Sequence, residues 1–409
     1  MRILHTSDWH LGQHFMGKSR EAEHRSFIQW LLCTVRDQCV DALIIAGDIF
    51  DTGTPPSYAR TMYNQFIVDL QKTCCRQLII VGGNHDSVAT LNESRQLLAC
   101  LNTSVIGGVA ENPEDQVITL KNNNNEPGAI VCAIPFIRPR EVLESRAGDS
   151  GTDKQQALQT AISDHYKTLF ELARKRAGAT LPIIATGHLT TVGGQVSESE
   201  REIYIGSLSA FPVNAFPDAN YIALGHLHRG QMVSKQQHIR YSGSPIPLSF
   251  GETSKAKQIL LVDFDGAKLK QVISVEVPRF RKLLILKGSL EQIEKQLGDL
   301  PEDDDLQPWL DIEVETDDYL TDLQNRVEQL VEGGPAILLR VRKNREKSAH
   351  TLITENRETL AELKVDDVFI QRLQQEEMSE DKQAMLTQAF REIVISVKED
   401  ETSQTMEVR

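Results

Sequence analysis

Seven side chains of metal-binding types follow five apolar runs of the chain, at points where buried strands are expected to end. The runs are Arg2 to Leu4, Ala42 to Ala46, Leu78 to Val81, Pro182 to Thr186 and Tyr221 to Leu224. The side chains are Asp8, His10, Asp48, Asn84, His188, His226 and His228. Ligands of an open α/β sheet bind beyond the carboxyl ends of its strands. We therefore expect these side chains to gather into one site.

This set of residue types suits two divalent ions, because it offers two carboxylates, four imidazoles and one amide oxygen. Residues two apart in an extended segment point to the same side, so Asp8 can join His10, and His226 can join His228. Mixed nitrogen and oxygen ligands favour manganese, iron or zinc over magnesium and calcium, without ranking the three. Two such ions would attract a phosphodiester and activate a water for its hydrolysis.

The prediction depends on the joint pattern, since a single Gly-His or Gly-Asp after a strand is more often a capped turn than a ligand. Five strand ends that all carry ligand-type residues would be a rare accident. The remaining histidines outside these motifs lack such neighbours and are interpreted as surface or packing residues: His5, His14, His24, His165, His238 and His350.

The spacing of apolar residues predicts the elements that hold the site. Helical periodicity covers Glu21 to Asp37, Tyr58 to Leu70, Leu91 to Leu101 and Lys154 to Ala177. A hairpin is expected within Gln116 to Ile134, and paired strands at Ile239 to Ser242, Ile259 to Phe264 and Val272 to Val277. Alternating strands and helices are typical of a layered α/β domain, which we expect to span residues 1–277.

Two further domains are expected after this one. Strand-like runs separated by helices, one of them starting at a capping box of Ser289 and Gln292, predict a small α+β domain over residues 278–346. Residues 347–409 carry apolar side chains three and four positions apart. They are expected to form amphipathic helices that need a partner surface.

Composition limits the function classes. The net charge of −14 argues against a protein that holds a polyanion by its overall field. No apolar run approaches the ~20 residues needed to span a bilayer, and the N-terminus becomes polar too early for a signal peptide. Six cysteines without a CxxC motif indicate reduced thiols. We expect a cytoplasmic protein with no membrane partner.

Residues 12–19 fit the pattern GxxxxGK[ST], so a P-loop ATPase is a formal alternative. A phosphate-binding loop should begin directly at the strand end, whereas Asp8-Trp9-His10 intervenes here. The alternative would also leave Asn84 and His188 without a role. The metal site is the stronger interpretation.

The motifs around these side chains resemble the signature of the calcineurin-like metallophosphoesterases. They are Asp8-Trp9-His10, Gly47-Asp48, Gly83-Asn84-His85-Asp86, Gly187-His188 and Gly225-His226-Leu227-His228. With Ser7 to Gly12, Gly47 to Asp51 and Tyr241 to Pro245, the chain further resembles the SbcD family of bacterial nuclease subunits over essentially its whole length. This resemblance implies a layered metallophosphoesterase β-sandwich with flanking helices, a small capping domain and a C-terminal helical tail.

The resemblance also implies a role for each site residue. One ion would be held by Asp8, His10, Asp48 and His228, and the other by Asp48, Asn84, His188 and His226, so that Asp48 bridges the two. His85 would protonate or stabilise the leaving oxygen. Asp51 would orient His85, or alternatively cap the following helix.

The implied activity is manganese-dependent hydrolysis of DNA, as an exonuclease on double-strand ends and an endonuclease on single strands and hairpins. Such nucleases act in DNA repair, recombination and replication, together with an SbcC-like coiled-coil ATPase on which the C-terminal helices would dock. Helices within 56–70 and 91–101 would form a homodimer within a heterotetramer, associated with the nucleoid.

Several basic residues are candidates for contacts with the DNA backbone. They are Arg138, Arg140, Arg279, Arg281 and Lys282, while Lys18 and Arg20 would contact phosphates or be solvated. Two alternatives to the nuclease remain. One is a phosphatase or phosphodiesterase of the same fold with a non-DNA substrate, and the other is a non-catalytic subunit that binds DNA ends.

Overall fold

The computed structural model describes residues 1–143, 151–195, 210–301, 305–315 and 320–343. These residues belong to one compact unit, Met1–Lys343. The helices predicted within 347–409 lie outside the described residues, as does His350.

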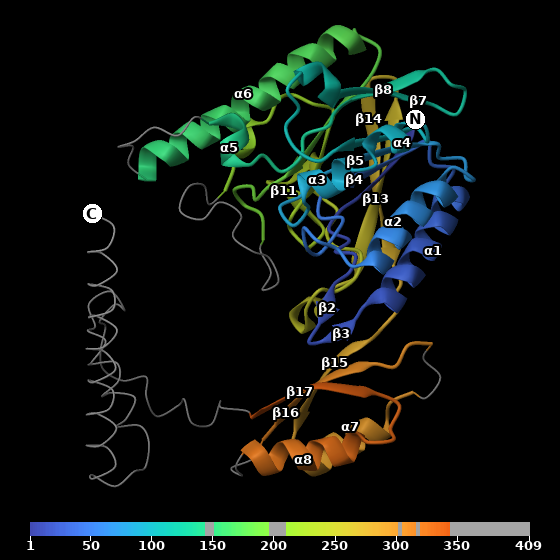
Figure 1. Ribbon diagram of the computed structural model, residues 1–409, viewed down its shortest axis with the longest axis vertical. Coiled ribbons are helices and arrows are strands. Elements are labelled where there is room, and N and C mark those ends of the chain that lie inside the picture. The colour runs from blue at the N-terminus through green and yellow to red at the C-terminus, as the bar shows by residue number, and fades with distance from the viewer. Residues whose placement is uncertain (144–150, 196–209, 302–304, 316–319, 344–409) are drawn as a thin grey trace. The chain divides into compact units, whose positions relative to one another are not determined.

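Two six-stranded sheets form the centre of this unit (Figure 1). The first has the order β14-β13-β1-β4-β5-β6, in which β1, β4, β5 and β6 are parallel. Its strands are β1 (Arg2–Thr6), β4 (Ala42–Ala46), β5 (Gln77–Val81), β6 (Thr103–Ile106), β13 (Lys257–Asp265) and β14 (Lys268–Val277). The second sheet has the order β11-β12-β10-β9-β8-β7. Its strands are β7 (Val117–Lys121), β8 (Pro127–Cys132), β9 (Ile183–His188), β10 (Tyr221–Gly225), β11 (Gln231–Val233) and β12 (Gln236–Tyr241).

The sheets pack face to face through buried apolar side chains, with Ile44 and Val81 from the first sheet and Ile184 from the second in one cluster. Helices cover the outer faces (Figure 1): α1 (Glu21–Asp37) and α2 (Ser57–Leu70) pack on the first sheet, and α6 (Gly151–Ala177) on the second. The predicted layered α/β sandwich with flanking helices is therefore confirmed.

The helix predictions depend on periodicity and succeed where a helix is long. α1 covers the predicted residues and buries Phe27, Leu31 and Val35 against the sheet. The single helix predicted over 91–101 is wrong. The structure has two short helices, α3 (Val88–Asn92) and α4 (Arg95–Ala99), because Ser87 caps the first and a new helix starts after Ser94. One more short helix, α5 (Pro139–Val142), precedes α6.

The strand predictions are right in position and partly wrong in pairing. β7 and β8 form the predicted hairpin, and β13 pairs with β14 as expected. β12, however, pairs with β10 and β11 in the second sheet rather than with β13. An apolar pattern identifies a strand but does not name its neighbour.

The segment that fits a P-loop pattern forms a small hairpin instead. β2 (His14–Phe15) pairs with β3 (Lys18–Ser19), and the turn between them has positive φ at Met16 and Gly17. A phosphate-binding loop would lead directly into a helix. The P-loop alternative is therefore contradicted.

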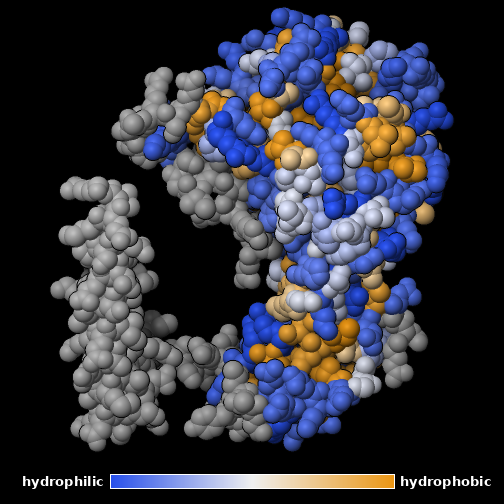
Figure 2. Space-filling model, in the orientation of Figure 1, coloured by the Kyte–Doolittle hydropathy of each residue, from blue (hydrophilic) through white to orange (hydrophobic). Residues whose placement is uncertain are grey.

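Residues after Val277 add a three-stranded parallel sheet with helices on one face. The strands are β15 (Leu283–Gly288), β16 (Trp309–Val314) and β17 (Ile337–Lys343), and the helices are α7 (Leu290–Gly298) and α8 (Leu320–Val331). The predicted capping box of Ser289 and Gln292 is confirmed at the start of α7. The outer face of α8 is hydrophilic (Figure 2), whereas Leu323 and Val327 pack inward. The opposite face of this small sheet meets the sandwich through Phe15, Phe250, Leu283 and Trp309.

Candidate metal centre

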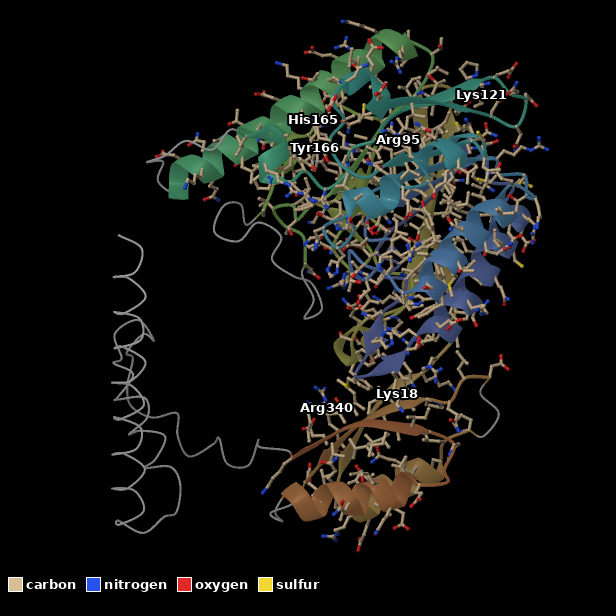
Figure 3. The ribbon with its side chains drawn as sticks, viewed as in Figure 1. Lys18, Arg95, Lys121, His165, Tyr166 and Arg340 are labelled. Carbon is tan, nitrogen blue, oxygen red and sulfur yellow. The ribbon has the colours of Figure 1, made fainter. Side chains whose placement is uncertain are left out.

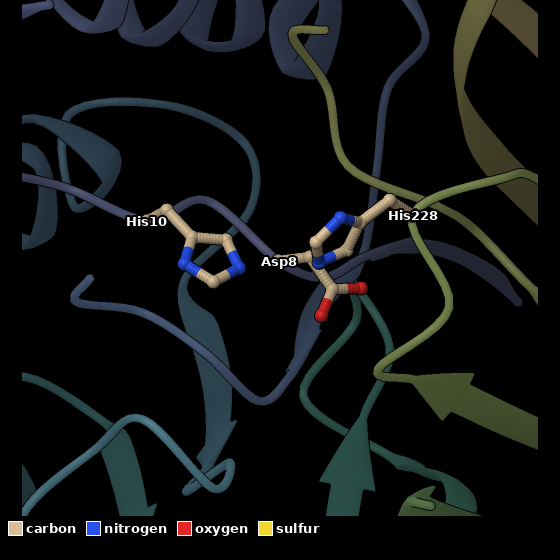
Figure 4. Close-up of side chains that lie close together, drawn as sticks. All are labelled: Asp8, His10 and His228. Atoms are coloured by element: carbon tan, nitrogen blue, oxygen red, sulfur yellow. The ribbon is translucent and has the colours of Figure 1, made fainter. Parts of the chain in front are cut away.

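Three buried side chains from both sheets converge in a first group, Asp8, His10 and His228 (Figure 4). One possible ligand atom of each lies within 4.8 Å of those of the others. Asp8 and His10 follow β1, and His228 follows β10. The group thus depends on two sheets meeting at their carboxyl ends.

A second group consists of Asp48, His188 and His226, again with ligand atoms within 4.8 Å of one another. Asn84 joins it, because its Oδ1 is 2.9 Å from His188 Nε2. Asp48 Oδ2 lies 3.2 Å from His188 Nε2 and 3.7 Å from His10 Nε2. Asp48 is therefore located between the two groups, where a bridging ligand would be.

The hydrogen bonds of the imidazoles leave one nitrogen of each for an ion. His10 Nδ1 is 3.2 Å from Asp51 Oδ1, and His188 Nδ1 is 2.9 Å from the carbonyl oxygen of Ala46. Carboxylates and carbonyls only accept, so both Nδ1 atoms carry the proton and both Nε2 atoms have a free lone pair. His10 Nε2 is buried without a hydrogen-bond partner. A buried unpaired nitrogen is costly, and a bound cation would satisfy it.

The backbone is unusual at four of the seven side chains. The φ angle is 55° at Asp8, 48° at His10, 49° at Asp48 and 94° at His226. Residues other than glycine rarely adopt positive φ, and such strain clusters at functional sites. The motif glycine Gly83 has a related function, since a Cβ there would overlap the carboxylate of Asp48.

The electrostatics of the two groups favour cation binding. Burial alone would keep Asp48 neutral, but the neighbouring His188 and His10 hold its pKa well below the ordinary value. Burial also opposes protonation of His188, yet the Asp48 carboxylate raises the pKa of His188 to about 9. The pKa of His226 falls to about 3, through burial and the positive charge of His188. The site thus combines an ionised carboxylate with a neutral imidazole, as a metal requires.

A family comparison decides the identity of this site. The sequence model described as Calcineurin-like phosphoesterase matches residues 1–230, a range that contains both groups. The chain belongs to the calcineurin-like phosphoesterase family.

Relatives of this phosphoesterase share one name, that of the SbcD component of the nuclease SbcCD. The protein of that name in Escherichia coli K12 is 51% identical over 392 residues, which cover 95% of this chain and 97% of its own. In Rhodobacter capsulatus it is 36% identical over 68% of this chain and 70% of its own. In Bacillus subtilis it is 31% identical over 78% and 81%. Residues 279–377 match a second family, described as Type 5 capsule protein repressor C-terminal domain.

His85 and Asp51 lie beside the metal groups of this phosphoesterase. His85 Nδ1 donates to the main-chain oxygen of Asp51 at 2.7 Å, and the His85 ring lies 4.8 Å from that of His10. Asp51 was expected to orient His85 or to cap the next helix. Its main chain contacts His85, whereas its carboxylate binds His10, and α2 has Pro56 at its N-cap without a side-chain cap.

Three basic residues expected to contact DNA or solvent have structural contacts instead. Arg20 is fully buried and forms an ion pair with Glu23. The side chain of Arg281 is 10% exposed, also pairs with Glu23 and lies 4.5 Å from the ring centre of Trp309. Arg138 donates to the main-chain oxygen of Asp86 at 2.8 Å, so it supports the loop that carries His85.

Other basic residues named from the sequence remain accessible. Lys18 is exposed on β3 (Figure 3), and Arg140 and Arg279 are exposed as well. Arg279 donates to the main-chain oxygen of Thr253 at 2.7 Å. Among the described residues, no helix is apolar and long enough to cross a membrane.

Four residues that support the ligands were missed by sequence reasoning. Ser7 Oγ is 2.5 Å from Asp8 Oδ2 and 2.8 Å from Ser242 Oγ. Glu252 Oε1 is 3.4 Å from His228 Nδ1, and Lys257 is paired with Glu252. Ser7 and Ser242 fall in motifs that carry the resemblance, so a signal existed for them. Glu252 and Lys257 lie in no motif.

Proposed function

We propose that this phosphoesterase is the nuclease subunit of a DNA-end-processing complex, which hydrolyses phosphodiester bonds at double-strand ends, hairpins and single strands. The observation that carries the proposal is the pair of ligand groups with Asp48 between them. The relatives named as nuclease components support DNA as the substrate, since one is 51% identical over 95% of the chain.

Two divalent ions fit the residues present, and we propose Mn²⁺. Asp8, His10, Asp48 and His228 would hold one ion, and Asp48, Asn84, His188 and His226 the other. The unpartnered Nε2 of His10 and the proximity of Asn84 Oδ1 to His188 Nε2 support this division. When bound, such ions supply charge that stabilises phosphorane-like transition states and an acidified water.

The side chains around the ions position the reaction. Asp51 holds His85 through its main-chain oxygen, which fixes the His85 proton on Nδ1 in the neutral ring. A second proton on Nε2 makes His85 a donor to the leaving oxygen of the cleaved strand. Arg138 and the buried Asp86 fix the loop between β5 and α3, because Asp86 accepts from the main-chain nitrogens of Ile49, Phe50 and Gly83.

We further propose the division of labour expected from the sequence. Residues 1–277 form the nuclease domain, 278–346 cap it and steer DNA, and 347–409 dock on an SbcC-like coiled-coil ATPase. Exposed Val68 of α2 and Leu97 of α4 support a homodimer contact there, within a heterotetramer. The complex would act in the cytoplasm at the nucleoid, in DNA repair, recombination and replication.

The test is digestion of end-labelled linear duplex by the full chain, alone and with the ATPase partner, in the presence of Mn²⁺. We expect nucleotides to be released by the wild-type chain and not by Asp48→Ala. A generic phosphodiester serves as the second substrate. Hydrolysis of that compound without cleavage of DNA would favour the alternative, a phosphodiesterase for a non-DNA substrate.

A further inference from the structure

A short 3-10 helix, η3 (Phe250–Ser254), lies behind the metal ligand His228. Its Glu252 approaches the ring from the side away from the ion position, with Oε1 3.4 Å from His228 Nδ1. Both side chains are buried, at 6% and 5% exposure. The carboxylate therefore contacts a ligand without being part of either ligand group.

Lys257, the first residue of β13, fixes this carboxylate. Its ammonium donates to Glu252 Oε2 at 2.5 Å, to Ser244 Oγ at 2.7 Å and to the main-chain oxygen of His228 at 3.0 Å. These three bonds use all three ammonium hydrogens. The same lysine thus anchors both the carboxylate and the backbone of the ligand it orients.

Glu252 has a further main-chain contact, because its Oε2 accepts from the nitrogen of Leu248 at 3.1 Å. The helix that carries it is held in turn by Phe250, whose ring lies 5.4 Å from that of Phe15 in a cluster with Leu283 and Trp309. The carboxylate is therefore fixed on several sides before any ion binds.

The chemical consequence concerns the tautomer of His228. An ionised carboxylate can only accept, so the proton of the neutral ring resides on Nδ1 and the Nε2 lone pair is available for an ion. A carboxylate behind a ligating imidazole also raises its basicity. In the first group His10 has Asp51 in this position, whereas in the second group His188 has only the main-chain oxygen of Ala46.

We propose that Glu252, held by Lys257, is a positioning residue that orients His228 and increases the affinity of the ion bound with Asp8 and His10. The proposal rests on the two-ion centre proposed above. It predicts a selective effect, because Glu252 contacts no side chain of the second group in the described contacts.

The experiment is calorimetric titration of the metal-free, full-length protein with MnCl₂. We expect two binding events for the wild type. Glu252→Gln should weaken one event about 10- to 100-fold and leave the other unchanged. Glu276→Gln, which changes an exposed carboxylate of β14, is the matched control and should retain both events.

Glu252→Gln leaves Lys257 as an unpaired buried charge, which can destabilise the fold. The double variant Glu252→Gln/Lys257→Met removes that charge, and thermal unfolding of the metal-free protein checks that it is folded. Selective loss of one event in the folded double variant supports the proposal. Two events of wild-type affinity overturn it. Fewer than two events in the wild type would instead contradict the two-ion centre itself.

Discussion

At the scale of single residues, the chemistry depends on separating ligands from the proton donor. His85 belongs to neither of the groups that contain Asp8 or Asp48, although its ring lies beside His10. We predict that His85→Gln binds two Mn²⁺ ions and cleaves DNA about 10²- to 10⁴-fold more slowly, because general acid catalysis is worth that much. Metal stoichiometry and single-turnover rates check this. Cleavage at the wild-type rate would remove the assigned role.

A second residue-scale prediction concerns His5, which is fully buried and hydrogen-bonded to the Tyr221 hydroxyl at 2.9 Å. Burial lowers the pKa of His5 to about 3 in the folded protein, whereas in the unfolded chain it is near 6.5. Below about pH 6.5 only the unfolded state takes up this proton. The stability that His5 contributes is complete above that pH and is lost progressively as the pH falls toward 3.

We therefore predict that the wild type loses about 2 kcal/mol of unfolding free energy relative to His5→Gln between pH 7.5 and 5. Denaturant titrations of both proteins across this range measure the difference. Glutamine stays neutral, so other titrating groups cancel in the comparison. Parallel pH profiles for the two proteins would show that His5 is not kept neutral by burial.

The sequence could predict the ligands but not their supports. Asp8, His10 and the other ligands follow apolar runs in motifs, and that signal is local in the chain. The partners of His10 and His228 are Asp51 and Glu252, which reach them only through the tertiary fold. Arg20 shows the same limit, since its burial depends on Glu23 and on the main chain of Pro247.

At the scale of elements, the contact between the β2–β3 hairpin and the small sheet is the feature most open to test. Trp309 is 2% exposed, stacks on Phe15 at 5.9 Å and lies under the Arg281 guanidinium at 4.5 Å. We predict that Trp309→Ala lowers the free energy of unfolding by about 3 to 5 kcal/mol, as for other buried aromatic residues.

Denaturant or thermal unfolding measures this loss. The control is Leu97→Ala, because Leu97 is 69% exposed and its loss should change stability by less than about 0.5 kcal/mol. Equal effects of the two substitutions would mean that the small sheet does not pack on the hairpin in solution.

Elements were predictable where one helix or strand covers a long periodic run. α1 and the capping box before α7 follow from residues near in sequence. The break between α3 and α4 was not predicted, because the apolar spacing continues across it while capping serines divide it. The position of β12 was missed because both sheets offer it similar apolar neighbours.

At the scale of the whole molecule, the site exists only in the folded sandwich. The sequence suggested strand ends meeting at one sheet, whereas β1, β4 and β5 belong to one sheet and β9 and β10 to the other. The ligands therefore come together only when the two sheets pack. Ions that bind this arrangement stabilise the folded state and not the unfolded chain.

We predict that Mn²⁺ at about 100 times its dissociation constant stabilises the wild type by about 2.7 kcal/mol per ion, and that a chelator removes this gain. The melting temperature with and without metal measures the effect. Asp48→Ala should respond much less, because it lacks the carboxylate between both groups. A metal response unchanged in that variant would place the ions elsewhere.

The central claim is a two-ion centre bridged by Asp48, and the most direct measurement is electron paramagnetic resonance of the Mn²⁺-loaded full chain. Ions about 3.5 to 4 Å apart that share a bridging ligand are expected to be exchange-coupled. We predict a coupled two-manganese spectrum at two equivalents for the wild type, and only uncoupled ions in Asp48→Ala. A wild-type spectrum of isolated Mn²⁺ at the same loading would contradict the bridged centre.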